Sequence, residues 1–340
     1  MHLKKLLITS TIIAATSISN NTVADIKISG EQEWNYLDAG GSFKSTLGSS
    51  TSFTFTGTGD LSNGISYLVK FTLEDGDQSY RAITFDLGSG LKLGIGYDQS
   101  YGIETVKAIS PYVNNRRADI TGAHRGLPTA ARKPLGPDVW DTSSGENAIG
   151  LSFKNDLAAI SFGFTPVRDV NTSTDAIATS SATSSEYGTA SSIGVKLTPV
   201  DGLTIGFGTS SEESDATANS DPKGTTIGFQ YKIGSFAIGY QEIENELDDT
   251  TTQRVTTTEI QEGGVAYKVN DALTIGVFAA NINYLTVNTD NGVETGMGIV
   301  QVGYNLGPAV IQYDYADGSD LNSTKDTEYE IHKVKIKVLF

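Results

Sequence analysis

The chain has 340 residues, of which 38% are hydrophobic, and a formal net charge of −16. It contains no cysteine, which excludes a disulfide framework. After residue 24 no segment reaches the roughly 18 consecutive apolar residues of a membrane-spanning helix, which excludes a helical membrane protein.

Residues 1–24 have the layout of a secretory signal peptide. Lys4 and Lys5 precede an apolar run over residues 6–15, and a polar stretch follows that ends at Ala24. The apolar run is too short to span about 30 Å of hydrocarbon as a helix. We therefore expect cleavage after Ala24 and a mature domain comprising residues 25–340.

The mature chain opens with strict alternation of apolar and polar side chains over residues 25–36. A period of two residues is that of a β-strand with one apolar and one polar face. The same alternation recurs in four further segments, at residues 53–55, 65–73, 83–87 and 91–97. The sequence therefore predicts five strands before residue 101.

Residues 101–146 interrupt this pattern and form one long connection. Its central part carries six basic residues against a single acid, Asp119. The six are Lys107, Arg116, Arg117, Arg125, Arg132 and Lys133. Because a loop of this length inside a compact domain is usually functional, we expect it to form the constriction of a pore.

Hairpins with a repeated apolar-Gly-apolar triplet follow the long connection. The central glycines are Gly150, Gly163, Gly194, Gly206, Gly228 and Gly239. Glycine weakens a strand, so its repetition on the non-apolar face indicates that this face must stay open or must bend. Curvature of a barrel wall is an equally good interpretation.

Two further hairpins and a last strand ending at Phe340 bring the total to eleven strands after the long connection and sixteen in all. Short turns alternate with longer polar connections, which is the layout of an outer-membrane barrel with all short turns on one rim. The predicted fold is all-β, a 16-stranded antiparallel transmembrane β-barrel.

The placement of aromatic and charged residues distinguishes a membrane barrel from a soluble β-sandwich. Aromatic residues lie near the short turns on the apolar parity, where an interfacial girdle needs them. They are Phe85, Phe153, Tyr231, Tyr240, Tyr267 and Tyr304. Charged residues such as Lys70, Asp86 and Lys196 occupy the other parity. A sandwich core would bury them at several kcal/mol each, whereas a water-filled lumen tolerates them.

Four segments resemble the Gram-negative trimeric porins, particularly the alphaproteobacterial type. They are residues 25–30, 53–73, 91–96 and 334–340. The resemblance implies passive diffusion of small hydrophilic solutes and ions through each subunit of a homotrimer in the outer membrane, with lipid and lipopolysaccharide as neighbours. It also implies that the third outer loop, residues 101–146, folds into the lumen. A terminal phenylalanine resembles the family's assembly signal, which assigns that role to Phe340.

The expected constriction opposes the basic loop to acidic residues of the wall. The wall residues are Glu31, Glu33, Glu74 and Asp98. In the family the inserted loop is often acidic and faces a basic wall. This chain reverses that arrangement, so the sign of ion selectivity does not carry over from the resemblance.

Neither an enzyme nor a metal site is expected. The mature chain has two histidines, His124 and His332, and no cysteine, so no metal cluster or Cys/His pair can be built. No cofactor or nucleic acid partner is expected either. Two alternatives to a general diffusion porin remain. One is a solute-specific channel with an oxyanion site lined by the loop arginines, and the other is a surface adhesin barrel.

Overall fold

The computed structural model describes residues 25–39, 45–97, 101–106, 109, 147–166, 189–213, 223–246, 255–286, 289–319 and 328–340. Residues 1–24 lie outside these ranges, so the signal peptide and its cleavage stay a prediction. In the described part no helix is long and apolar enough to cross a membrane.

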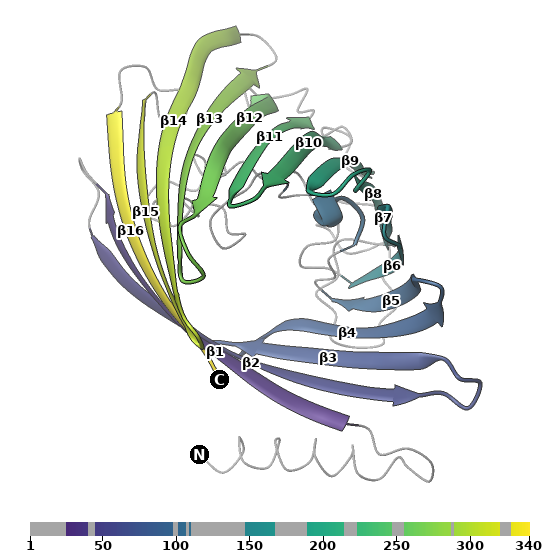
Figure 1. Ribbon diagram of the computed structural model, residues 1–340. Helices are drawn as coiled ribbons and strands as arrows, with labels where there is room; N and C mark the ends of the chain where they lie inside the picture. The colour runs from purple at the N-terminus through teal and green to yellow at the C-terminus, as the bar shows by residue number, and fades with distance from the viewer. Residues whose placement is uncertain are drawn as a thin grey trace, which may run out of the picture.

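Sixteen antiparallel strands form a closed barrel in which each strand pairs with its neighbours in sequence and β1 pairs with β16 (Figure 1). The strands are β1 (Asp25–Ala39), β2 (Thr46–Asp60), β3 (Ser66–Glu74), β4 (Asp77–Gly88), β5 (Leu91–Tyr97), β6 (Asn147–Lys154), β7 (Ala158–Thr165), β8 (Ala190–Leu197), β9 (Leu203–Glu212), β10 (Lys223–Ile233), β11 (Phe236–Glu246), β12 (Val255–Lys268), β13 (Leu273–Thr286), β14 (Thr289–Leu306), β15 (Ala309–Ser319) and β16 (Glu328–Leu339). The predicted fold class and the division into five and eleven strands are confirmed.

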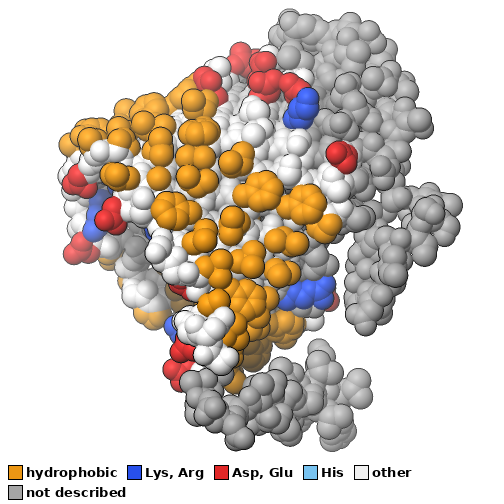
Figure 2. All heavy atoms as spheres, turned by 90° about the vertical axis from the view of Figure 1, so that its right-hand side faces the viewer, with side chains coloured by type: hydrophobic (Ala, Val, Ile, Leu, Met, Phe, Trp, Pro, Cys, Tyr) orange, Lys and Arg blue, Asp and Glu red, His pale blue; other side chains and the backbone are white. Residues whose placement is uncertain are grey.

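Alternate residues of each strand face outward and inward. The outward residues are large and apolar, as with Ile26, Ile28 and Trp34 on β1, and they remain exposed. Figure 2 shows such side chains gathered in a broad belt on the outer surface. Tyr231, Tyr267 and Tyr304 lie at one edge of this belt, next to short turns, as expected of an interfacial girdle.

One rim of the barrel, which we call the short-turn rim, carries seven short connections and the C-terminal Phe340. The opposite, long-loop rim has two short connections where the sequence pattern predicts long ones. β3 and β4 are joined by Asp75 and Gly76, both with positive φ (50° and 96°), and Thr286 of β13 pairs with Thr289 of β14. An Asp-Gly dipeptide suits a two-residue hairpin turn because both residues tolerate the left-handed region.

A five-residue 3-10 helix, η1 (Gly102–Val106), lies inside the barrel and contacts the inner faces of β7, β8 and β9 (Figure 1). Ile103 and Val106 have no exposed surface. The first part of the long connection therefore enters the lumen, as the resemblance implied for a third outer loop.

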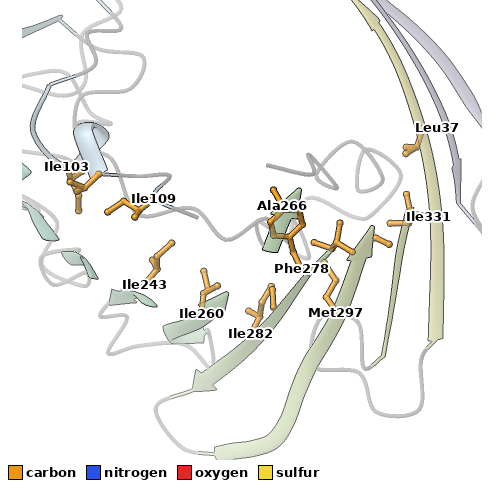
Figure 3. Packing of buried hydrophobic residues seen from close by; sticks show 14 residues of the cluster. Leu37, Ile103, Ile109, Ile243, Ile260, Ala266, Phe278, Ile282, Met297 and Ile331 are labelled. Carbon is orange, nitrogen blue, oxygen red and sulfur yellow. The ribbon is translucent and has the colours of Figure 1, made fainter. Parts of the chain in front are cut away.

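The inner wall is less polar than predicted. Ile243, Ile260 and Ile282 are direct cross-strand neighbours on β11, β12 and β13, and each is at most 2% exposed. They belong to a cluster of buried apolar residues that runs along the inside of the wall from η1 to β1 (Figure 3). The expectation that charged or polar residues line the lumen is wrong for this part of the wall.

Candidate pore interior

Glycines on the inward parity make room for the inner segment, by which we mean residues 101–106 and 109. A Cβ built on Gly150 would overlap the ring of Tyr101, and one on Gly194 would overlap the backbone of Gly102. Gly208 faces Val106 and Ile103, whose side chains would lie 2.7 and 2.8 Å from an added Cβ. Close approach of a second layer of chain therefore explains the triplet glycines Gly150 and Gly194, and also Gly208, which lies outside the triplets.

Polar side chains of the wall bind the backbone of the inner segment. Ser161 Oγ accepts a hydrogen bond from Gly102 N at 2.9 Å. Gln241 Oε1 accepts from Ile109 N at 3.0 Å, and its Nε2 donates to Val106 O at 3.1 Å. Gln230 Nε2 donates to Ile109 O at 3.0 Å.

These bonds satisfy backbone groups that have no partner in regular secondary structure. A buried backbone N–H or C=O group without a hydrogen bond would destabilise the folded protein. Gln241 has no exposed surface and reaches both Val106 and Ile109, so it is the central anchor. Sequence reasoning did not single out Gln230 or Gln241. A usable signal was present, because both are amides on the inward parity two residues from a triplet glycine.

The seam between β1 and β16 carries a ladder of ion pairs inside the lumen. Glu33 pairs with Lys335 at 3.0 Å, both side chains being 12% exposed, and Glu31 pairs with Lys337. Asn35 Nδ2 also donates to Glu33 Oε1 at 2.9 Å. Two of the four carboxylates expected to face the constriction, Glu31 and Glu33, are thus compensated by lysines of the last strand.

Glu74 lies in register with Ser52 of β2, which in turn pairs with Glu31, so the structure brings Glu74 and Glu31 into one row of the wall. The remaining predicted site residues lie outside the described part of the chain. They are Lys107, Arg116, Arg117, Arg125, Arg132, Lys133 and Asp98. The opposition of a basic loop to an acidic wall therefore stays a prediction.

The described histidine, His332, lies on the outward face of β16. Its Nδ1 is 2.7 Å from the hydroxyl of Tyr313, and its Nε2 is 3.3 Å from Glu330 Oε1. Over the described ranges no group of three or more histidines and carboxylates is arranged to hold a metal ion.

Comparison with known proteins identifies the same architecture. A family model described as Gram-negative porin matches residues 9–321. An anion-selective porin from Comamonas acidovorans has a TM-score of 0.64 at 13% identity, over 93% of this chain and 100% of that chain. OmpT, an outer membrane protein of Vibrio cholerae, has a TM-score of 0.63 at 13% identity, over 95% and 100%. A porin refined at 1.8 Å resolution has a TM-score of 0.62 at 15% identity, over 93% and 100%. A comparison with curated protein sequences finds no match.

Proposed function

Because this chain belongs to the Gram-negative porin family and is an outer-membrane channel, we propose that small hydrophilic solutes and ions diffuse passively through its lumen past the inner segment. Membership of this family indicates a channel rather than an enzyme. The observation that carries the proposal is a closed barrel, apolar outside, into which the chain folds back and narrows the lumen.

The basic residues between Lys107 and Lys133 form the constriction in this proposal, together with the wall residues Glu31, Glu33, Glu74 and Asp98. The pairing of Glu31 and Glu33 with lysines of β16 supports a locally positive potential, because these carboxylates have little uncompensated charge to set against the loop. Acidic residues at the long-loop rim, such as Glu242 and Glu244, attract cations, so the net ion preference is weak and depends on salt.

In this proposal the outer surface contacts three kinds of partner. Lipid covers the apolar belt, lipopolysaccharide lies against the polar long-loop rim, and two further copies complete a homotrimer. The comparison with OmpT of Vibrio cholerae includes a trimer form, with a TM-score of 0.59 at 13% identity, which supports the third.

Single-channel recording in planar bilayers tests the proposal. A general diffusion porin should give a steady open current that scales with bulk conductivity. Saturable block that is lost when Arg116, Arg117 and Arg125 are replaced would favour the solute-specific channel with an arginine-lined site, and a folded protein without channels would favour the adhesin. Cross-linking in detergent, followed by separation on a denaturing gel, tests the trimer.

A further inference from the structure

We propose that Lys154, Lys196 and Lys232, which we call the lysine arc, form a binding site for small oxyanions such as phosphates and carboxylates. The site lies between the inner segment and the short-turn rim. It is distinct from the basic residues 107–133, and it rests on the proposed function only in requiring that solutes enter the lumen.

The placement of the arc follows from strand alternation. Lys154 is four residues beyond Gly150 on β6, and Lys196 is two beyond Gly194 on β8. Steps of two residues keep the same face and cover about 6.6 Å each along the strand. Since Gly150 and Gly194 contact the inner segment, both lysines project into the lumen just on its short-turn side.

Lys232 lies on β10 at the same rim, four residues beyond Gly228, which continues the register row of Lys154, Lys196 and Gly206. It is two residues beyond Gln230, whose side chain donates to the carbonyl of Ile109. Three strands thus present an ammonium group beneath the inner segment.

The cross-strand neighbours of the arc lysines are small residues. Lys154 is opposite Ala159 of β7, and Lys196 is opposite Ala159 on one side and Gly206 on the other. Lys232 is opposite Ala237 and hydrogen-bonds through its backbone to Gly202. One strand, β7, lies between Lys154 and Lys196, so their backbones are about 10 Å apart, a distance that two four-carbon side chains can bridge around a shared ligand.

Two other lysines of this rim, Lys268 and Lys92, have carboxylate partners, whereas no described residue forms an ion pair with the arc. Lys268 lies 2.8 Å from Asp271, and Lys92 lies 3.9 Å from Asp86. None of the ion pairs between described residues includes Lys154, Lys196 or Lys232.

Lys154 and Lys196 are like charges on either side of Ala159 in one row of the wall. Two neighbouring ammonium groups that no carboxylate of the described residues pairs with attract an anion, and a doubly charged anion more than a singly charged one. An ammonium binds phosphate as a point charge, so the site selects for charge rather than for planar shape. A small oxyanion is therefore the ligand class that this site fits.

Block of channel current by inorganic phosphate tests the site. The protein is reconstituted in a planar bilayer in KCl, and phosphate is added at constant ionic strength. We expect saturable block in the unmodified protein and a half-blocking concentration at least about tenfold higher in Lys154→Gln/Lys196→Gln, since two charge-assisted contacts are lost. Lys196→Arg keeps the charge, so phosphate should block its current with nearly the same half-blocking concentration as in the unmodified protein.

Lys268→Gln is the matched control, because this lysine belongs to the same rim and face but is paired with Asp271. It should leave the half-blocking concentration unchanged. An equal shift in Lys268→Gln would show that the summed positive charge of the rim, and not a specific site, causes the block. An absence of phosphate block in the unmodified channel would also refute the proposed site. Loss of all channel current, by contrast, would count against the proposed function.

Discussion

Gly30 and Phe340 exchange two backbone hydrogen bonds, and the phenyl ring of Phe340 lies directly over the bare Cα of Gly30. Gly30 N donates to Phe340 O at 2.7 Å, and Phe340 N donates to Gly30 O at 3.0 Å. The ring also meets Phe53 edge to face, with centroids 5.8 Å apart. The last residue of the chain thus closes the barrel against its first strand at the short-turn rim.

We predict that Gly30→Ala weakens this closure, because a Cβ at this position would overlap the ring of Phe340. Displacing the ring should lower the free energy of unfolding by about 1–3 kcal/mol, the usual cost of overpacking. Urea unfolding in detergent micelles, followed by tryptophan fluorescence, measures it. Gly57→Ala on β2 is the control, since an added Cβ there meets nothing within 4 Å. Equal stability of the two variants would contradict the role of the contact.

Deletion of Phe340 should hinder assembly in the outer membrane while leaving export intact. Without Phe340 the backbone of Gly30 loses both partners, and an unpaired edge in lipid is costly. Fractionation and immunoblotting of outer-membrane and periplasmic extracts measure the outcome. Phe340→Trp keeps an aromatic ring and serves as the control. Normal outer-membrane levels of the deletion variant would refute the assignment of Phe340 as an assembly signal.

The pair of Glu33 and Lys335 should contribute to stability because both side chains are largely buried at the seam. Lys335→Gln removes the ammonium group that pairs with the largely buried Glu33, so we expect a loss of roughly 1–3 kcal/mol, partly recovered in Glu33→Gln/Lys335→Gln. Lys92→Gln should change stability by less than about 0.5 kcal/mol, since its pair with Asp86 is longer and half exposed. Additive effects in the double variant would show that the two groups do not interact.

Gln241→Leu should release the inner segment from the wall. The change removes the amide that binds both Val106 and Ile109, at a cost of about 1–3 kcal/mol for buried backbone groups left without partners. We expect a larger and noisier single-channel conductance. Gln261→Leu, which faces outward from β12, is the control. An unchanged conductance in Gln241→Leu would mean that the inner segment does not depend on this anchor.

Replacing Arg116, Arg117 and Arg125 with serine tests the constriction charges. If these side chains line the path, the reversal potential in a salt gradient should shift toward cation preference, and the shift should diminish as ionic strength rises. An unchanged reversal potential would show that the three arginines hold the loop in place without lining the path.

Strand number, strand facing and the membrane class were predictable from sequence because lipid outside and water inside act on each strand separately. The alternation of apolar and polar residues around Ile26, Tyr231 and Tyr304 follows directly from the need for one face toward lipid and one toward water. The short turn at Asp75-Gly76 was also within reach, since an Asp-Gly dipeptide identifies it. The isoleucines at Ile243 and Ile260 were visible on the inward parity and show a partly apolar inner wall.

The contacts that shape the pore were decided by closure of the barrel. Gly150 and Gly194 lie on β6 and β8, with β7 between them, and the folding of the chain into one lumen brings both against the inner segment. Glu33 meets Lys335 because the two ends of the chain join at the seam. A periodic pattern specifies which side of a strand a residue faces, whereas its partner across the lumen depends on the order and register of all sixteen strands.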